Sequence, residues 1–349
     1  MKKYTFISIA PKRFGGIDLL TPLFFDLKTN YDVKLIQFFY KIKAYQDLKK
    51  DDFLYSTWKK SIDKSYVLSN SKIIFKLFFN FKLLLRIIIS KNVILLTDGK
   101  ISKRNLKFLQ YIIFLKKAKF LCHPSILSIE ESNNCKNLIN LVFSKKRNEN
   151  LNEISIGFPK LYHSWKSEIH KYNVENPFIK KDQKLITVFI PSTVKNVFDN
   201  EELNVWLNEV LESISIYCPG FLIIFKPHPM IDLKLLEDFI KKYPKINIKI
   251  SCLNPSLLAN VSSFVISHHS ATILDGLFLK RKVIMYINFT NNWLKRHPNG
   301  SVYSKLNVLF SSTRKSLNDN IKKCLEAEED DSMVIESLLG HEYGVSNLF

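Results

Sequence analysis

The stretch "SFVISHHSATILDGLFLKRKVIMY", from Ser263 to Tyr286, decides the fold. It begins with a short apolar run, passes through a polar loop and an apolar helix-like segment, and ends in a basic turn and a second apolar run. Two parallel strands need a crossover between them, and this crossover is usually a helix. The pattern therefore predicts a strand–helix–strand unit of a parallel sheet.

The same alternation continues along the chain in both directions. Apolar, β-branched runs predict strands at "YTFISIA", "YDVKLIQFF" and "NVILLTDG", and later at "KLITVFIPS", "GFLIIFKPHP" and "KINIKISC". Helical patterns such as "EELNVWLNEVLESISIY" lie between the later runs. We therefore predict an α/β fold of two doubly wound, Rossmann-like domains that face a cleft.

A polar segment with a proline, "KYNVENPFIKKDQK", separates the two series of strands and helices. A chain of 349 residues suits about two domains of ~150 residues each. We expect a first domain over 1–170, a linker over 171–184 and a second, donor-binding domain over 185–325. A C-terminal helix with an acidic start and a tail are expected over 326–349.

The balance of charge favours an anionic partner. Lys and Arg number 52 against 32 Asp and Glu, so the net charge is +20. Arginine is scarce beside lysine and no nucleic-acid-binding motif occurs, so nucleic acid is not expected as the partner. Five scattered cysteines without a CxxC pair predict a reducing cytoplasm, no disulfide frame and no metal site. The apolar stretch at the N-terminus is short and ends at Pro11, so it predicts a first strand rather than a signal peptide.

The segment from Ser71 to Ile89, "SKIIFKLFFNFKLLLRIII", predicts a basic amphipathic helix. On a helical projection, its four basic residues and Asn80 fall within about 160°, and the remaining residues are apolar. Two interpretations carry equal weight. The helix lies on an anionic membrane surface, as in a peripheral membrane protein of the cytoplasm, or it packs a wide apolar face on its own sheet with its lysines in solvent, and both can hold together.

The motif "FKPHP" ends the strand-like run that begins at Phe221. Pro227 and Pro229 stop the strand and stiffen the turn that carries His228. Ligands of open α/β sheets bind beyond the carboxyl ends of the strands. An imidazole there can donate a proton or a hydrogen bond, and Lys226 adds a positive charge for a phosphate. An ordinary strand-ending turn with a surface histidine is the alternative.

The loop "SHHSATILD" follows the strand-like run that begins at Phe264. Ser270 and Thr272 lie where a helix is expected to begin, a place where hydroxyls and N–H groups bind anions. Asp275 follows in the first turn. A plain helix cap is the alternative for these three residues.

Three further strand ends carry candidate residues. "VILLTDGK" delivers Asp98 to the end of a strand, where a carboxylate suits a general base, although Asp-Gly is also a common turn. Gly15 and Gly16, in the loop after the first strand, and Ser192 and Thr193, at the end of "KLITVFIPS", are candidate loop contacts.

Four segments in this order resemble the CDP-glycerol glycerophosphotransferase superfamily and, more broadly, GT-B transferases of bacterial capsule, teichoic acid and lipopolysaccharide. They are "GFPK", "VFIPST", "IIFKPHP" and "FVISHHSATILDGLFLKRKVIMY", within about Ile154 to Tyr286. The family has His-Gly where this chain has Asp98-Gly99, and Asp-Tyr-Ser-Ser where this chain has His268 to Thr272. An acidic residue before Gly, a His-Pro turn and a later Ser/Thr pair are similar to bacterial sialyltransferases.

The resemblance implies an inverting transfer that needs no metal and no cofactor, from a nucleotide-activated donor to a glycan or lipid-linked acceptor. Asp98 would take the proton from the acceptor hydroxyl, and His228 and Lys226 would hold or protonate the departing phosphate. Ser270 and Thr272 would bind that phosphate, and Asp275 would contact ribose. His268 and His269 stand where the family binds its donor.

Four functions remain open from the sequence. The leading hypothesis is a glycosyltransferase of surface polysaccharide synthesis, with a CMP-linked acidic sugar as one donor class. The next is a transferase of glycerol phosphate or another polyol phosphate. The third is a non-catalytic nucleotide-binding partner in polysaccharide assembly. The least favoured is a sugar-nucleotide epimerase of the same fold.

Overall fold

A computed structural model describes most of the chain. The residues described are 4–11, 14–69, 72–97, 119–122, 139–142, 153–180, 182–194, 198–288, 293, 295, 300–306 and 308–326. The chain divides into two compact units, Met1–Glu168 with Leu339–Phe349, and Ile169–Leu338. This division falls inside helix α6 (His163–Glu175), which includes the first residues of the segment that the sequence assigned to a linker. The expected acidic C-terminal helix lies outside the described residues.

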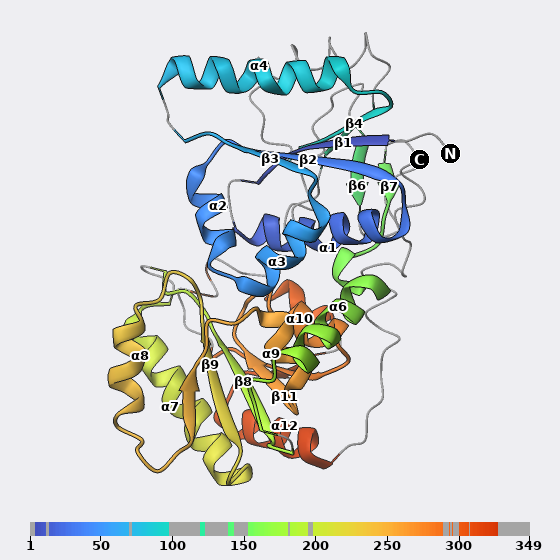
Figure 1. Cartoon of the computed structure of the whole chain (residues 1–349). Helices are drawn as coiled ribbons and strands as arrows, with labels where there is room; N and C mark the ends of the chain where they lie inside the picture. Colours follow the sequence, from blue (N-terminus) through green and yellow to red (C-terminus); the bar gives the residue numbers. More distant parts are fainter. Residues whose placement is uncertain are drawn as a thin grey trace. The chain divides into compact units, whose positions relative to one another are not determined.

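The first unit is a parallel sheet with the strand order β3-β2-β1-β4-β5-β6-β7. Helices α1, α2 and α3 lie on one face of this sheet, and α4 lies on the other (Figure 1). The strands are β1 (Tyr4–Ile9), β2 (Val33–Phe39), β3 (Lys64–Val67), β4 (Val93–Thr97), β5 (Lys119–Cys122), β6 (Ile139–Val142) and β7 (Glu153–Ser155). The helices are α1 (Phe14–Asn30), α2 (Ile42–Lys49), α3 (Asp52–Ser61), α4 (Ile73–Ile89) and the short η1 (Pro159–Leu161).

Alternation along the strands divides the core of this unit into two layers. Successive side chains of a strand point to opposite faces of the sheet. Phe6 therefore packs with Leu20 and Phe24 of α1, while the next residue, Ile7, packs on the α4 side with Phe79. Both faces of the central strands are covered, which explains why these strands are rich in apolar residues on both faces.

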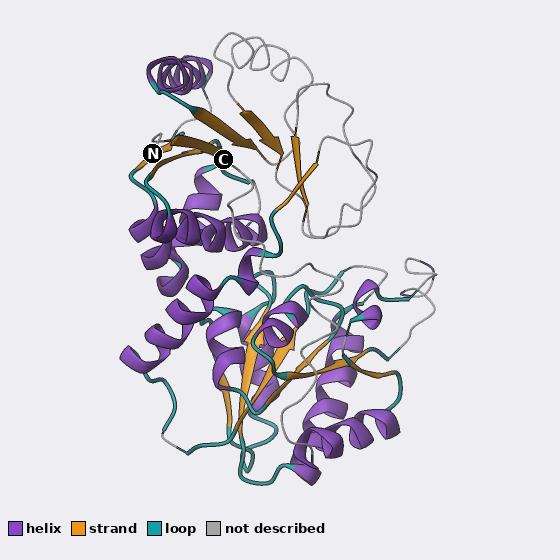
Figure 2. Cartoon of the chain, turned by 90° about the vertical axis from the view of Figure 1, so that its right-hand side faces the viewer, coloured by secondary structure: helices purple, strands orange, loops and turns teal. Residues whose placement is uncertain are grey.

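The second unit is also a parallel sheet, with the strand order β10-β9-β8-β11-β12-β13. Its strands lie between helices, as Figure 2 shows. The strands are β8 (Leu185–Ile190), β9 (Leu222–Pro227), β10 (Ile248–Ile250), β11 (Phe264–Ser267), β12 (Lys282–Tyr286) and β13 (Leu309–Ser311). The helices are α7 (Asn200–Tyr217), α8 (Leu233–Ile240), α9 (Pro255–Val261), α10 (Ile273–Phe278), α12 (Arg314–Glu326) and the short η2 (Val302–Lys305).

The predicted fold class, two doubly wound Rossmann-like units, is confirmed. The strand–helix–strand unit at Ser263 to Tyr286 forms as β11, α10 and β12, with β11 and β12 paired in parallel. The sequence misplaced Gly15 and Gly16, which lie in the first turn of α1 rather than in a loop. Gly16 fits closely against Pro11: a Cβ on Gly16 would lie 2.6 Å from the Pro11 Cβ.

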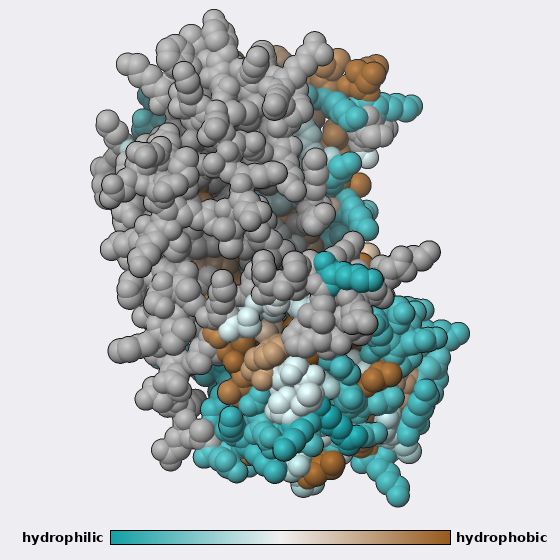
Figure 3. Space-filling model, turned by 180° about the vertical axis from the view of Figure 1, so that it is seen from behind, coloured by the Kyte–Doolittle hydropathy of each residue, from teal (hydrophilic) through white to brown (hydrophobic). Residues whose placement is uncertain are grey.

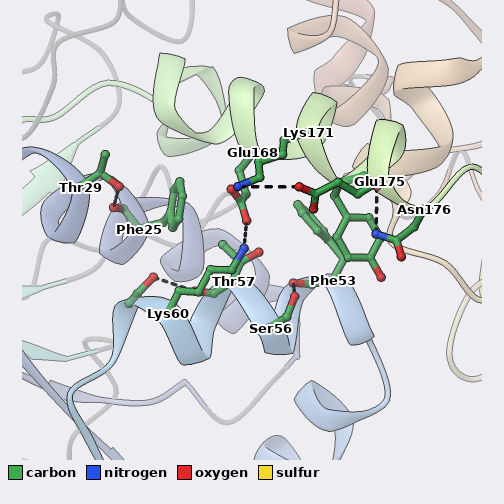
Figure 4. Close-up of polar contacts among 12 residues, drawn as sticks. Phe25, Thr29, Phe53, Ser56, Thr57, Lys60, Glu168, Lys171, Glu175 and Asn176 are labelled. Atoms are coloured by element: carbon green, nitrogen blue, oxygen red, sulfur yellow. Dashed lines mark hydrogen bonds and ion pairs between the residues drawn. The ribbon is translucent and has the colours of Figure 1, made fainter.

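The first turns of helix α6 pack on helix α3 of the first unit. In the first unit, Glu168 forms an ion pair with Lys60 of α3 at 2.5 Å, and Trp165 packs on Phe53 with ring centroids 5.2 Å apart. Figure 4 shows Glu168 above α3 and the last turns of α6 with Lys171 and Glu175. The aromatic and ionic contacts together hold the first turns of α6, up to Glu168, against α3.

Helix α4 does not bury a wide apolar face. Its buried residues form a narrow stripe of Phe79, Leu83 and Ile87, with the half-buried Leu84 packed beside them, and its other large apolar side chains are exposed. The helix thus packs on its own sheet, as one interpretation expected, but the face that it buries is narrow rather than wide. Among the described residues, no helix combines the length and the apolar character needed to cross a membrane.

Candidate functional site

The second sheet has its topological switch point between β8 and β11. From β8 the chain builds outward through β9 and β10 on one side, and then through β11, β12 and β13 on the other. This is the 3-2-1-4-5-6 order of dinucleotide-binding sheets, whose ligands bind outside the carboxyl ends of the strands where the order reverses. A ligand site is therefore expected at the loops after β8 and β11.

The loop after β8 carries Ser192 and Thr193, both half-buried. A short bridge closes this loop: the backbone N–H of Val194 donates to the Phe198 carbonyl at 2.8 Å, and the N–H of Phe198 donates back at 3.0 Å. The Phe198 ring then lies 4.6 Å from the ring of His268, which follows β11. A ring contact thus connects the two loops at the switch point.

Two consecutive histidines after β11 have different environments. His268 is buried, with its ring between Phe198 and Trp206 of α7. The Nδ1 atom of His269 lies 2.9 Å from the hydroxyl of Ser301, and its ring contacts Tyr303 at 5.2 Å between centroids. His268 is therefore a buried residue packed on aromatic rings. His269 instead connects the loop after β11 to the segment after β12 through its contacts with Ser301 and Tyr303.

The hydroxyls predicted to bind phosphate form a small cluster of their own. The Thr272 hydroxyl donates to the Ser270 hydroxyl at 3.0 Å, and the Thr272 N–H donates to the same oxygen at 3.4 Å. Helix α10 starts directly after Thr272 and is six residues long. Asp275 in its first turn is buried, and its carboxylate accepts a 2.5 Å hydrogen bond from Ser256 of α9.

His228 sits where the sequence predicted, just beyond the end of β9. Its backbone N–H donates to the Ile190 carbonyl of β8 at 3.0 Å, so the ladder between β8 and β9 extends one residue past Pro227. The Nδ1 atom accepts a hydrogen bond from the Met230 N–H at 3.2 Å, which leaves the proton of the neutral ring on Nε2. Burial and the positive charge of Lys226 lower the pKa of His228 below its usual 6.5. At neutral pH this imidazole is a neutral hydrogen-bond donor.

The structure thus brings part of the predicted set together. Ser192, Thr193, His228 and the loop from His268 to Thr272 follow three adjacent strands, β8, β9 and β11, at their carboxyl ends. Gly15 and Gly16 belong to the first unit. Asp98 lies outside the described residues.

Sequence reasoning missed a second polar group at the same edge of the sheet. The hydroxyl of Tyr286, the last residue of β12, donates to Glu209 of α7 at 2.6 Å, and the Asn288 amide donates to the same carboxylate at 3.3 Å. Burial and the bond to Glu209 raise the pKa of Tyr286. The position of Tyr286 at the end of a predicted strand was the available clue, but Glu209 comes from a helix 77 residues away in sequence.

Among the described residues, no group of three or more His, Cys, Asp or Glu side chains is arranged to hold a metal ion. Neither a protein-family model nor a curated protein sequence matches the chain.

Solved structures do match it over nearly its whole length. UDP-GlcNAc 2-epimerase from Methanocaldococcus jannaschii is 15% identical, with 98% of this chain and 97% of that chain covered and a TM-score of 0.61. A glycosyltransferase from Rickettsia africae is 17% identical, with 93% and 89% covered and a TM-score of 0.54. MnaA of S. aureus, solved with UDP, is 13% identical, with 99% and 93% covered and a TM-score of 0.55. At these identities the likeness concerns the fold, and it agrees with the predicted GT-B class.

Proposed function

We propose that this chain is a glycosyltransferase that binds a nucleotide-activated sugar at the carboxyl edge of the second sheet. One observation carries the proposal: the predicted donor-side residues follow adjacent strands at the switch point of a 3-2-1-4-5-6 sheet. Structures of the same fold support a nucleotide-sugar donor. One is a glycosyltransferase, and the M. jannaschii epimerase has also been solved with UDP-GlcNAc and UDP.

The proposed reaction is an inverting transfer. The acceptor hydroxyl oxygen attacks the anomeric carbon and forms the new glycosidic bond. The bond from that carbon to the nucleotide phosphate oxygen breaks, and its electron pair leaves with the phosphate. Asp98 takes the acceptor proton. Donors placed at the departing phosphate supply the largest catalytic term, because negative charge develops there.

The contacts around His228 define its proposed role in the transfer more closely. Its lowered pKa makes the ring neutral at pH 7, and the Met230 N–H occupies Nδ1, so Nε2–H is the group that donates to the leaving phosphate. Lys226, next to the turn, supplies the positive charge. The hydroxyls of Ser270 and Thr272 complete the phosphate side, and His269 is proposed to orient the donor together with Ser301. A ribose contact by Asp275 stays a prediction.

A sugar-nucleotide epimerase is the second candidate, because the M. jannaschii epimerase has the highest TM-score of the three structures compared. Both candidates would bind the nucleotide sugar at the same site. In a glycosyltransferase an acceptor hydroxyl attacks the sugar, whereas in an epimerase a base removes a proton from it. A polyol-phosphate transferase and a non-catalytic nucleotide-binding protein would share the phosphate contacts as well.

The test is a binding screen of CMP, CDP, UDP and GDP by calorimetry, followed by turnover of the sugars and polyols linked to the nucleotide that binds. A glycosyltransferase releases the nucleotide only when an acceptor glycan is present. An epimerase converts the sugar to its C2 epimer without an acceptor, as NMR would show. Binding without either reaction identifies a non-catalytic partner, and absence of all nucleotide binding rejects the proposal.

A further inference from the structure

The outward face of helix α4 is apolar. Ile74, Leu77, Phe78 and Phe81 have exposed fractions of 78%, 63%, 58% and 58%, and the same face continues toward the end of the helix through Leu85, Ile88 and Ile89. We call these seven residues the outer face. In Figure 3 it forms the brown area at the upper right, with hydrophilic side chains beneath it. A contiguous apolar surface that is exposed to solvent is typical of an interaction site.

The helical projection separates the outer face from the contacts with the sheet. At 100° per residue, the buried stripe of Phe79, Leu83 and Ile87 spans about 80°, and the outer face is centred about 180° away from it. An ordinary surface helix places its polar residues opposite the buried stripe. Helix α4 has large apolar residues there instead, so packing on the sheet does not explain them.

The basic residues of α4 lie on the side nearer the sheet. The Arg86 Nε donates to the Tyr66 hydroxyl of β3 at 2.8 Å. The Lys82 Nζ lies 4.5 Å from the centroid of the Phe78 ring and 5.8 Å from that of Tyr66. Lys72 and Lys76 are exposed at the start of the helix, and no acidic residue occurs from Ser71 to Lys91. On the projection, Lys82 therefore borders the outer face, about 80° from its centre, whereas Lys72 and Lys76 lie about 160° from that centre.

Charge decides between the possible occupants of this face. A second copy of the chain, docked through the same face, has the same net charge of +20 and the same lysine beside that face, so it offers no opposite charge. An anionic lipid bilayer is complementary on both counts, because its acyl boundary accepts the apolar side chains and its headgroup phosphates attract the lysines.

We propose that α4 docks the protein on an anionic lipid bilayer. The helix lies in the plane of the interface, with the outer face in the acyl boundary, Lys82 at the level of the phosphates, and Lys72 and Lys76 above it on the headgroup side. Its 17 residues extend for about 25 Å. This proposal stands apart from the transfer reaction, because vesicle binding is measured without any substrate.

The first experiment compares full-length proteins by co-sedimentation with vesicles of equal parts phosphatidylglycerol and phosphatidylcholine. The variant Ile74→Ser/Phe78→Ser/Phe81→Ser is expected to lose about tenfold or more in partitioning, because three buried apolar side chains contribute well over one factor of ten. Val205→Ser/Ile216→Ser, which removes exposed apolar side chains from α7, is the matched control and is expected to bind like the wild type. Pure phosphatidylcholine vesicles are expected to bind much more weakly.

A second measurement does not depend on loss of binding. The four native tryptophans are all buried, so Phe81→Trp adds a probe on the outer face. Its fluorescence is expected to shift to the blue with anionic vesicles and to be quenched by lipids with brominated acyl chains. The proposal is overturned if the wild type does not partition to anionic vesicles, if the triple variant partitions equally well, or if neutral vesicles bind as strongly. A dimer that the triple variant converts to monomers, without vesicle binding, would assign the face to a second copy instead.

Discussion

At the scale of single residues, neighbouring side chains of the same type have different environments and therefore different roles. His268 and His269 are adjacent, yet the first is packed between two aromatic rings and the second meets a serine hydroxyl. His228 is half-buried, and its two ring nitrogens are distinguished by one backbone hydrogen bond. What each histidine can do depends on these local partners.

Replacing His228 tests the proposed contact with the leaving phosphate. His228→Ala is expected to lower kcat by about 10²–10³-fold, as loss of one preorganised donor does, while the melting temperature stays near that of the wild type. His228→Gln keeps a side-chain N–H and is expected to recover part of the activity. The exposed His163→Ala is the control, with unchanged activity expected. Full turnover by His228→Ala would remove this residue from the scheme.

The pH profile tests the same residue independently. Because the folded pKa of His228 is lowered below 6.5, its neutral form predominates above that pH and is lost as the pH falls through the folded pKa. We therefore expect kcat/KM to show no limb due to His228 between pH 6.5 and 8. A decline within that window that disappears in His228→Gln would contradict the assignment of a neutral donor.

Two adjacent glycines provide a matched pair at the start of α1. A Cβ on Gly16 would lie 2.6 Å from the Pro11 Cβ, whereas a Cβ on Gly15 would have no heavy atom within 4 Å. Gly16→Ala is expected to destabilise the protein by about 1–3 kcal/mol through overpacking. Gly15→Ala is expected to be neutral or to stabilise by up to about 1 kcal/mol, because alanine favours the helix. Chemical denaturation of both variants measures the difference, and equal effects would refute the packing argument.

At the scale of elements, local sequence determines where the helices begin near the site. Helix α7, which carries Trp206 and Glu209, starts with a complete capping box: Asp199 accepts from the N–H groups of Glu201 and Glu202, and the Glu202 carboxylate accepts from the Asp199 N–H. A proline marks the end of β9: Pro227 is its last residue and has no N–H to donate to a neighbouring strand.

The capping box predicts a measurable cost. Asp199→Ala is expected to reduce the free energy of unfolding by about 1 kcal/mol, because two N–H groups of the first turn lose their acceptor. Asn200→Ala alters the next exposed position without touching the cap and is expected to change stability by less than half as much. Urea denaturation of the two variants makes the comparison, and a larger loss in Asn200→Ala would show that the cap is not the source of the stability.

At the scale of the whole molecule, each unit is stabilised by contacts between residues far apart in the chain. In the first unit, the buried Lys160 of η1 forms an ion pair at 2.5 Å with Asp18 of α1, 142 residues away in sequence. In the second, the Trp206 indole of α7 donates to the Tyr286 carbonyl of β12 at 3.0 Å. Such contacts hold segments that are distant in sequence together in the core of each unit.

Breaking the Lys160–Asp18 pair is expected to destabilise the first unit. Lys160→Met leaves a carboxylate largely removed from water without this partner, at a cost of about 3–5 kcal/mol. Hydrogen exchange followed by mass spectrometry should show faster exchange in α1 peptides and unchanged exchange in α7 peptides. The double variant Lys160→Met/Asp18→Leu removes both charges and is expected to recover most of the loss. Equal protection of α1 in the wild type and in Lys160→Met would contradict the prediction.

The sequence by itself determined the class of fold and the main strands, because parallel strands buried on both faces are apolar throughout and end in local breakers such as Pro227. It also placed His228 and the loop from His268 to Thr272 at strand ends. It did not reveal short strands such as β3 and β13, whose few residues show no periodicity.

Only the tertiary structure decided which side chains of those loops are packed and which meet polar partners, because burial depends on neighbours from distant elements. His268 is buried by Phe198 and Trp206, and Asp275 is held by Ser256. The same holds for α4. Its sequence shows a wide apolar face, but the sheet buries only Phe79, Leu83 and Ile87 fully and Leu84 in part, and this leaves the outer face exposed.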